Sequence, residues 1–245
     1  MKKLVIIPTY KEKENVQHIL DAIFNLGQQY HVLVIDDNSP DGTALIVKDL
    51  QQNHPNELFL IERSGKLGLG TAYIAGFEWA LSNGYDFIFE MDADFSHDPN
   101  DLERLFDACH TGGADMAVGS RYVRGGMIEN WPLSRKLISK AGALYSKIIT
   151  WLPVNDATSG FVCYSRKVLS AIDLRAIQFI GYAFQIEMKF VTWKLGFRIK
   201  EVPIVFRDRK FGASKMTKGI IKEGILGVLS MQLQYLFGGR RKSFK

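Results

Sequence analysis

Two aspartates, Asp92 and Asp94, directly follow a continuous apolar segment over residues 85–91. In an extended chain the side chains of residues i and i+2 point the same way, so both carboxylates face one ligand. Oxygen donors of this kind suit Mg²⁺ or Mn²⁺, and a cation that keeps open positions normally shares a diphosphate with the protein. The alternative is a solvated loop that caps the next helix. The strand before the pair and Pro99, which opens a predicted helix after it, favour the metal site.

A second acidic pair, Asp36 and Asp37, follows the predicted strand over residues 31–35. Such a pair can hold a ribose or the amino group of a base. Residues 38–42 have the composition of a turn, so an Asx turn is the competing interpretation. Both interpretations are compatible: the turn presents Asp37, while Asp41 caps the helix predicted over 43–50.

Two further features leave alternatives open. The glycine-rich segment over residues 65–70 lacks P-loop spacing. It either presents backbone N–H groups or Lys66 to a phosphate, or it is a plain flexible loop. His97 is either an additional metal ligand or a histidine of a surface loop, and its position in the sequence favours the surface loop.

The elements that must position these residues alternate between strand and helix in the first 120 residues. Short apolar runs separated by helices are typical of a parallel sheet that is covered on both faces and binds ligands beyond the carboxyl ends of its strands. The sequence therefore predicts an α/β fold with a mostly parallel sheet. The strands are predicted at 3–7, 31–35, 58–61, 85–91 and 115–119, and the helices at 16–26, 43–50, 70–83 and 99–108.

The alternation weakens after residue 120. A turn followed by a strand is predicted over 156–164, and an edge strand over 197–206. Helices are predicted over 134–151, 184–195 and 217–237. The last of these is amphipathic and precedes a basic tail. It either lies at a membrane surface or packs on the protein's own core. Its apolar side is predicted to hold Ile220, Ile221, Ile225, Leu226, Leu229, Leu233 and Leu236, with Lys218 and Lys222 as cationic flanks.

Composition narrows the class of protein. Of the 245 residues, 47% are hydrophobic and 23% are charged, which argues against a disordered, collagen-like or coiled-coil chain. Two cysteines exclude a disulfide scaffold. The apolar run over residues 4–7 is too short for a signal peptide, and no apolar stretch reaches the roughly 18–20 residues that span a bilayer. We therefore expect a cytoplasmic protein.

Charge is distributed unevenly. Residues 1–120 hold 8 basic and 19 acidic residues, which gives a net charge of −11. Residues 121–245 hold 23 basic and 7 acidic residues, which gives a net charge of +16. The acidic part suits a cation, and the basic part suits a phosphate-bearing partner, an anionic membrane or nucleic acid. Aromatic residues are not interleaved with basic ones, which disfavours nucleic acid. The candidate phosphate-binding residues of the basic part are Arg121, Arg135, Arg207, Arg209 and Lys215.

Seven ordered segments together resemble a known family: residues 8–15, 34–43, 91–97, 119–122, 129–131, 158–161 and 208–216. Single segments are common to many family 2 glycosyltransferases. The full set, which runs from about residue 3 to 216, resembles the dolichol-phosphate (polyprenol-phosphate) mannose synthases of glycosyltransferase family 2.

The resemblance implies a GT-A fold. It also implies an enzyme that transfers mannose from GDP-mannose to a polyprenyl (dolichyl) phosphate and inverts the configuration at the anomeric carbon. It implies a catalytic domain over 1–216, divided into a nucleotide-sugar half (1–120) and an acceptor half (121–216). Residues 217–245 would form the membrane-interface helix and basic tail. The protein would then associate peripherally with the cytoplasmic face of a membrane.

The resemblance also assigns site residues. The guanosine part of the donor would contact Pro8, Tyr10, Glu12, Ile35 and Asp37. The diphosphate would meet Asp92, Ala93 and Asp94, with Asp94 as the principal ligand of Mg²⁺ or Mn²⁺. The donor's sugar and phosphates would contact Arg121, Arg209 and Lys215, and the acceptor phosphate would contact Arg135 and Ser139.

The chain departs from the family pattern in two places. Some relatives carry glutamine as a further metal ligand where this chain has Ser96, so the third ligand is expected to be weaker or to be replaced by water. Many relatives carry C-terminal transmembrane helices, which this sequence does not show. Membrane contact would then fall to the amphipathic helix or to a separate membrane subunit.

Three alternatives remain. The same fold could use UDP-glucose or another UDP-sugar as the donor. A haloacid-dehalogenase-type phosphatase also places D-x-D after a strand, but it needs that motif near the first strand, and here Asp36 and Asp37 precede Asp92. A non-catalytic nucleotide-binding or membrane scaffold is disfavoured because Asp92, Asp94 and Arg121 are all present.

Overall fold

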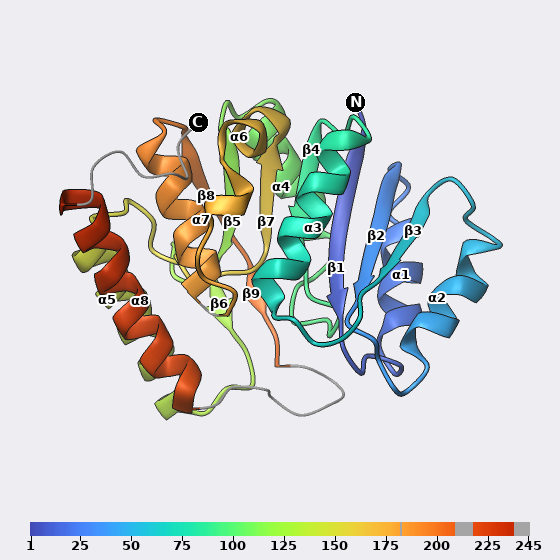
Figure 1. Ribbon diagram of the computed structural model, residues 1–245, viewed down its shortest axis with the longest axis horizontal. Coiled ribbons are helices and arrows are strands. Elements are labelled where there is room, and N and C mark those ends of the chain that lie inside the picture. The colour runs from blue at the N-terminus through green and yellow to red at the C-terminus, as the bar shows by residue number, and fades with distance from the viewer. Residues whose placement is uncertain (182, 209–217, 238–245) are drawn as a thin grey trace.

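A computed structural model of the protein describes residues 1–181, 183–208 and 218–237. These residues form a seven-stranded sheet in the order β3–β2–β1–β4–β7–β5–β8 (Figure 1). The mostly parallel sheet predicted from the sequence is confirmed. Its strands are β1 (Lys3–Thr9), β2 (Tyr30–Asp36), β3 (Leu58–Glu62), β4 (Phe87–Glu90), β5 (Met116–Ser120), β7 (Val162–Ser165) and β8 (Ile199–Pro203).

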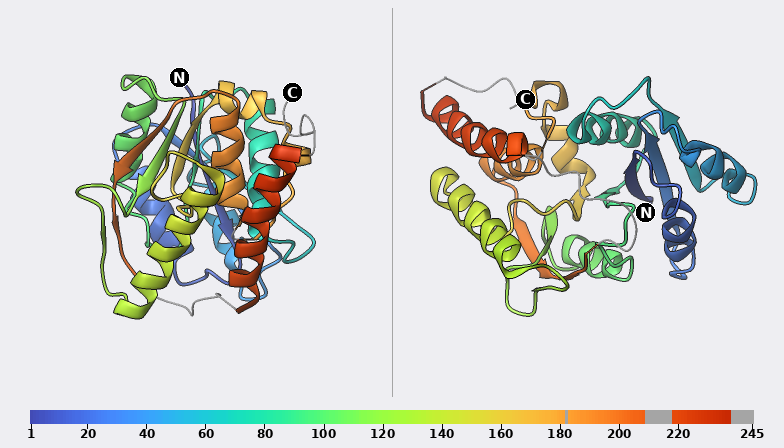
Figure 2. Two further views of the ribbon diagram at one scale, coloured as in Figure 1. Left: turned by 90° about the vertical axis from the view of Figure 1, so that its left-hand side faces the viewer. Right: turned by 90° about the horizontal axis from the view of Figure 1, so that it is seen from below.

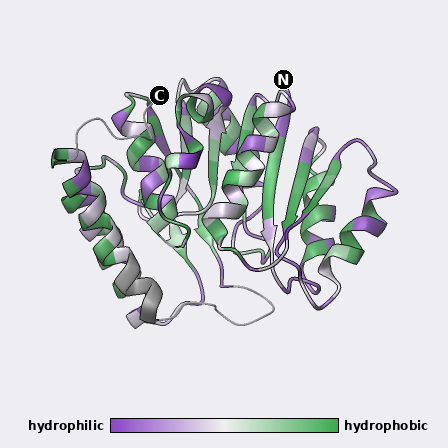
Figure 3. Ribbon diagram, viewed as in Figure 1, coloured by the Kyte–Doolittle hydropathy of each residue, from purple (hydrophilic) through white to green (hydrophobic). Residues whose placement is uncertain are grey.

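Helices cover both faces of the sheet because alternate residues of each buried strand point to opposite sides. In β1, Val5 and Ile7 join one core, and Leu4 and Ile6 join the other. The central strands are accordingly apolar along their length (Figure 3). The first core is covered by α1 (Val16–Phe24), α2 (Thr43–Gln51) and α4 (Asp101–His110). The second is covered by α3 (Leu69–Ser82), α6 (Arg166–Ala171) and α7 (Ala183–Lys194).

Strand β7 is antiparallel to both of its neighbours, β4 and β5. The sequence predicted a strand here but did not predict its direction. Its first residue, Val162, pairs with Glu90 at the carboxyl end of β4. The segment that leads into β7 therefore lies at the edge of the sheet where the parallel strands end.

Helices α5 (Leu133–Thr150) and α8 (Lys218–Phe237) lie side by side at one end of the molecule (Figures 1 and 2). Tyr145 Oη donates a hydrogen bond to the Ile225 carbonyl at 2.9 Å. Near them, β6 (Met127–Ile128) pairs in parallel with β9 (Val205–Phe206). Within the described residues, no helix has the length and apolar character needed to cross a bilayer.

The part of the last helix that can be described packs on the protein with one side and exposes apolar side chains on another. Val228 and Met231 are buried in a core cluster with residues of α7, so α8 packs on the protein. Other apolar residues of α8 are exposed: Ile225, Leu226, Leu229, Leu233 and Leu236. The side chains of Ile220, Ile221, Lys218 and Lys222 lie outside the described residues.

Gly70, in α3, and Gly142, in α5, test how tightly these two helices are packed. A Cβ atom on Gly70 would lie 2.9 Å from both Ile180 Cα and the Phe179 carbonyl oxygen, which are backbone atoms. We expect Gly70→Ala to lower the free energy of unfolding by about 1–3 kcal/mol. Gly142, inside α5, has no atom within 4 Å of such a Cβ. Gly142→Ala should therefore raise stability by about 0.5–1 kcal/mol. Urea unfolding of both variants measures the difference, and equal effects would contradict the packing described.

Candidate active site

The polar segments predicted to form the site converge at the carboxyl edge of the sheet. They follow β1, β2, β4 and β5, and the segment before β7 joins them because that strand runs the other way. Three of these loops hold a non-glycine residue in the left-handed region: Lys11 (φ 57°), Asn38 (φ 56°) and Phe95 (φ 61°). Such strain persists only where the surrounding structure enforces it, and it is typical of functional sites.

The turn after β2 contains the Asx turn that was the competing interpretation of this segment. Asp36 accepts hydrogen bonds from the Ser39 amide (2.8 Å), the Ser39 hydroxyl (2.6 Å) and the Thr9 hydroxyl (2.8 Å). Asp37, the residue after the aspartate that forms this Asx turn, is buried. The prediction that Asp41 is the N-cap of α2 is wrong by one residue, because Gly42 (φ 89°) occupies that position. Asp41 nevertheless accepts from the Thr43 amide at 3.1 Å and so satisfies one of the first amides of the helix.

Arg63 is a residue of this region that sequence reasoning missed. Its Nε and Nη2 atoms lie 2.6 and 2.5 Å from Asp37 Oδ1, and both side chains are buried. The same guanidinium donates to Thr71 Oγ1 (2.7 Å) and to the Gly68 carbonyl (3.1 Å). The end of the glycine-rich segment is thus linked to Asp37 through Arg63. The available signal was the position of Arg63 directly after the third strand, at the same edge of the sheet.

The other residues predicted to hold guanosine differ in exposure. Pro8, within β1, and Tyr10 and Glu12, in the loop that follows it, are half-buried. Lys66 Nζ lies 5.0 Å from the centre of the Tyr10 ring, so the glycine-rich segment reaches this loop. Ile35 is fully buried in the core that α3 covers. It therefore packs in the core next to the site and presents no accessible surface to a ligand.

The D-x-D loop presents its two acids differently. Asp94 is buried and its Oδ1 atom accepts from the Ser96 amide (3.1 Å) and the Ser96 hydroxyl (2.6 Å). The Asp92 side chain is 41% exposed, and Ala93 between them is buried. Ser96 therefore donates to the predicted principal ligand and orients it, as partners of ligating carboxylates commonly do.

This donor set fits a hard divalent cation. Two carboxylates with a hydroxyl beside them supply oxygen ligands only, which Mg²⁺ and Mn²⁺ prefer. No third acidic, histidine or cysteine side chain joins them to complete a metal cluster among the described residues. The residues therefore suit a cation that takes its remaining ligands from a diphosphate and water.

His97 is not the surface residue that the sequence favoured. It is buried, and its ring stacks on Phe161 with the ring centres 4.8 Å apart. Burial lowers the pKa of His97 to about 4, so the ring is neutral near pH 7. Nδ1 accepts the Asp92 amide at 3.2 Å. The histidine therefore fixes the backbone of the D-x-D loop, and this nitrogen is not presented to a metal.

Buried polar residues lie beneath this loop. Glu90, the last residue of β4, accepts from Gln185 Nε2 (2.6 Å) and the Tyr164 hydroxyl (3.2 Å). Lys189, also fully buried, donates to Gln185 Oε1 (3.1 Å) and to the Ser159 carbonyl (2.7 Å). Burial raises the pKa of Glu90 to about 7, with the charge of Lys189 acting against the rise. Burial likewise lowers the pKa of Lys189 to about 8, opposed by Glu90.

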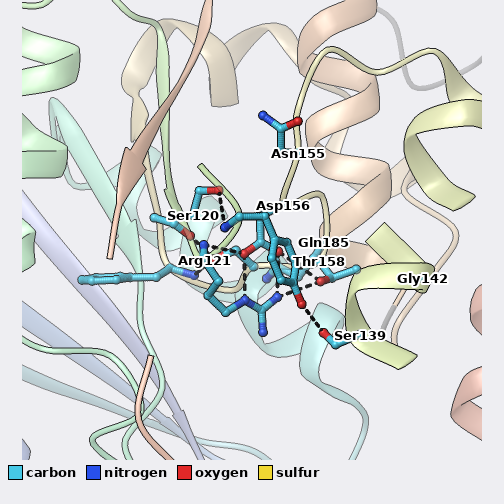
Figure 4. Close-up of polar contacts among 12 residues, drawn as sticks. Ser120, Arg121, Ser139, Gly142, Asn155, Asp156, Thr158 and Gln185 are labelled. Atoms are coloured by element: carbon cyan, nitrogen blue, oxygen red, sulfur yellow. Dashed lines mark hydrogen bonds and ion pairs between the residues drawn. The ribbon is translucent and has the colours of Figure 1, made fainter. Parts of the chain in front are cut away.

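Arg121, after β5, is held by a buried carboxylate that sequence reasoning missed (Figure 4). Its Nε and Nη2 atoms each donate to Asp156 at 2.7 Å, and Nη2 also donates to Thr158 Oγ1 at 2.9 Å. The Arg121 amide donates to the same carboxylate at 2.9 Å. Burial acts to raise the pKa of Asp156, but the charge and hydrogen bonds of Arg121 outweigh it and hold that pKa below its usual range.

Arg135 and Ser139 lie one turn apart near the start of α5. Ser139 accepts from the Tyr122 hydroxyl at 2.7 Å, which joins α5 to the segment that carries Arg121 (Figure 4). Arg135 stacks on Trp131, with its Cζ atom 3.8 Å from the ring centre, and forms an ion pair with Asp208 at 3.2 Å. The structure thus brings the predicted acceptor residues close to Arg121.

The remaining candidate phosphate-binding residues are placed only in part. Arg207 forms ion pairs with Asp98 (3.2 Å) and Glu129 (3.1 Å). Arg209 and Lys215 lie outside the described residues.

Comparison with known proteins identifies the class. Residues 4–173 match the model of glycosyl transferase family 2, so the chain belongs to this family and is a glycosyltransferase. It is 44% identical over 227 residues to the polyprenol monophosphomannose synthase of Mycolicibacterium smegmatis, covering 93% of this chain and 85% of that protein. It is 46% identical over 241 residues to the undecaprenyl-phosphate mannosyltransferase of Micrococcus luteus, covering 98% of each.

Solved structures support the fold. A mannosyltransferase of Pyrobaculum calidifontis, in complex with GDP-Man and Mn²⁺, matches with a TM-score of 0.62 at 17% identity, covering 97% of this chain and 64% of that one. The glucosyl-3-phosphoglycerate synthase of Mycobacterium tuberculosis, in complex with Mn²⁺, UDP and glucosyl-3-phosphoglycerate, matches with a TM-score of 0.66 at 18% identity. The match covers 95% of this chain and 79% of that one. The predicted GT-A fold is confirmed.

Proposed function

We propose that this glycosyltransferase moves mannose from GDP-mannose to a polyprenyl phosphate and forms polyprenyl-phosphate β-mannose. The names of the two relatives support this substrate pair. The arrangement of the site supports the proposal: the acidic loop after β4 and Arg121 after β5 lie at the same edge of the sheet, and Arg121 and Arg135 both lie near Trp131. The donor would lie against residues 1–120 and the acceptor against residues 121–216.

On the donor side, Asp92 and Asp94 would hold Mg²⁺ or Mn²⁺. When bound, the cation neutralises charge that develops on the leaving diphosphate. Ser96 and His97 prepare this loop by orienting the Asp94 carboxylate and the Asp92 backbone. Asp37 would contact the guanosine part of the donor.

On the acceptor side the chemistry needs no strong general base. A phosphate monoester is largely ionised near pH 7, since its second pKa is about 6. An oxygen of that anion attacks the anomeric carbon, the bond to the diphosphate oxygen breaks, and direct in-line displacement inverts α-mannose to β. The task of the protein is to hold two anions together, and guanidinium groups suit that task.

The ion pairs of the two arginines predict different roles. The Arg135–Asp208 pair is about one-third exposed on both sides, and exposed pairs contribute little stability. An acceptor phosphate can therefore replace Asp208 at low cost. The Arg121–Asp156 pair is almost fully buried, so Arg121 keeps its orientation while substrates exchange.

We further propose that α5 and α8 place the enzyme on a membrane surface. Both helices expose large apolar side chains, which together we call the α5–α8 apolar surface. It comprises Leu133, Leu137, Ile138, Leu144, Ile148, Ile225, Leu226, Leu229, Leu233, Leu236 and Phe237. Arg135 and Ser139 lie on one of these helices, so a lipid phosphate bound there would stay close to the bilayer. A separate membrane subunit covering the same surface is the alternative.

The first test is titration calorimetry with GDP and with UDP, each with and without Mn²⁺. We expect GDP to bind more tightly than UDP and to bind more tightly still with the metal. Radiolabelled transfer from GDP-mannose to polyprenyl phosphate should follow. A preference for UDP would move the assignment to a UDP-sugar transferase, and binding of neither nucleotide would contradict the proposal.

Replacing the principal metal ligand tests the donor side. We expect Asp94→Ala to lower mannose transfer at least about 100-fold, because a catalytic metal supplies several kcal/mol of charge stabilisation. The variant should also lose the effect of Mn²⁺ on GDP affinity. Asp49→Ala, on the exposed face of α2, is the matched control. Near-normal transfer by Asp94→Ala in excess Mg²⁺ would overturn the metal assignment.

Vesicle co-sedimentation tests the membrane proposal. We expect the protein to bind vesicles that contain anionic lipid, and Leu226→Glu combined with Leu137→Glu to reduce binding about tenfold or more. The control is Leu45→Glu, since Leu45 is an equally exposed leucine on the distant helix α2. Equal vesicle binding by the unmodified protein, the double variant and Leu45→Glu would exclude the α5–α8 apolar surface as the membrane contact. Failure of the unmodified protein to bind would favour a separate subunit.

A further inference from the structure

Glu201, on the edge strand β8, accepts four hydrogen bonds, and the reaction proposed above assigns it no role. Its Oε1 atom accepts from the Ser120 hydroxyl (2.7 Å) and the Asp156 amide (2.9 Å). Its Oε2 atom accepts from the Asn155 amide (2.9 Å) and the Asn155 side-chain amide (2.8 Å). One carboxylate therefore organises the residue before Arg121 and the two residues that end in Asp156.

These four bonds exclude a direct role in binding a metal or substrate. A carboxylate has about four lone-pair sites, two on each oxygen. Two donors reach each oxygen of Glu201, so the capacity of the carboxylate is used within the protein. All four donors are neutral, and no lysine or arginine of the described ranges forms an ion pair with Glu201. Its negative charge is therefore stabilised at close range by oriented amides and a hydroxyl, while the buried Lys189 attracts it from a longer distance.

The contacts continue from Glu201 to Arg121. Glu201 fixes the backbone amide of Asp156, and the fully buried Asp156 carboxylate accepts the Nε, Nη2 and amide hydrogens of Arg121 (Figure 4). Ser120, which also donates to Glu201, is the preceding residue. The guanidinium additionally lies over Phe206, with its Cζ atom 5.2 Å from the ring centre. Any displacement of residues 155–156 would therefore tilt the guanidinium.

We infer that Glu201 is a positioning residue that acts through the 155–156 backbone and the Asp156 carboxylate to fix the guanidinium of Arg121 for phosphate binding. The inference rests on the proposed function, because it assigns the phosphate-binding role to Arg121. Glu201 itself touches no substrate. A misplacement of about 1 Å at a reacting centre costs about 100-fold in rate. Loosening this support should thus lower kcat more than it changes KM for the donor nucleotide, which binds largely through other residues.

The test is a double-mutant cycle. We expect Glu201→Gln, which puts an amide nitrogen where two donors converge, to lower kcat for mannose transfer about 10- to 100-fold. In an Arg121→Lys background the same change should have less than about a twofold effect, because Lys cannot make the two-pronged contact with Asp156. Glu78→Gln, at an exposed pair with Arg175, is the matched control. Independent, multiplying effects of Glu201→Gln and Arg121→Lys would overturn the inference.

A second readout does not depend on activity. The Nε–H of Arg121 gives its own nitrogen–proton resonance, identified by its absence in Arg121→Lys. Bonded to buried Asp156, it should exchange slowly with water, and Glu201→Gln should accelerate that exchange about tenfold or more. Unchanged exchange in Glu201→Gln would contradict the inference. If the unmodified enzyme transfers no mannose, the proposed function fails, while this measurement still decides the positioning role.

A milder variant covers the case in which Glu201→Gln does not fold. Asn155→Ala removes one of the four bonds, together with the bond that Asn155 Oδ1 accepts from Lys147 (2.7 Å), and leaves both backbone amides in place. It should shift exchange of the Arg121 Nε–H and kcat in the same direction by a smaller factor. A folded Asn155→Ala protein with unchanged values of both would overturn the inference.

Discussion

Burial of charge beneath the site is the constraint on which the rest of the structure depends. Glu90, Asp156, Arg121 and Lys189 are almost completely removed from water. Isolated charges in such positions would cost several kcal/mol each, so they are tolerated only as partners that satisfy one another. Glu90 belongs to the acidic half of the chain, whereas the other three belong to the basic half. Gln185 contacts both Glu90 and Lys189, so this buried network links β4 of the acidic half to residues of the basic half.

The reversed direction of β7 makes this network possible. In a fully parallel sheet only the loops after the strands reach the carboxyl edge. Because β7 enters the sheet from that edge, the residues before it are delivered between β4 and β5. Asp156 thereby reaches Arg121, and the Ser159 carbonyl reaches Lys189. One antiparallel strand thus places a polar segment between the predicted donor loop and the predicted acceptor residues.

The sequence predicted the features that depend on local pattern. Apolar runs and helical spacing located the central strands, and acids at strand ends indicated the edge that carries the site. Contacts between distant segments were not predictable in this way. Arg63 meets Asp37 from 26 residues away, and Asp156 meets Arg121 from 35 residues away. His97 showed no periodic signal for burial, because its burial involves stacking on Phe161, which is distant in the sequence and precedes the neighbouring strand β7.

An enzyme that holds two anions together can use an arginine fixed by a buried carboxylate or an arginine whose carboxylate partner a phosphate can replace. An arginine compensated by a buried carboxylate offers less net attraction to a phosphate, but its orientation is set before the substrate arrives. Preorganised groups cost no reorganisation during the reaction, and this is the larger benefit in catalysis. An arginine paired at the surface keeps its full attraction, because the phosphate simply takes the place of the carboxylate. Arg121 and Arg135 occupy these two states on adjacent elements, joined by the bond from Tyr122 to Ser139. The fixed arginine is therefore suited to the reacting centre, and the exchangeable one to capture and release of a lipid phosphate.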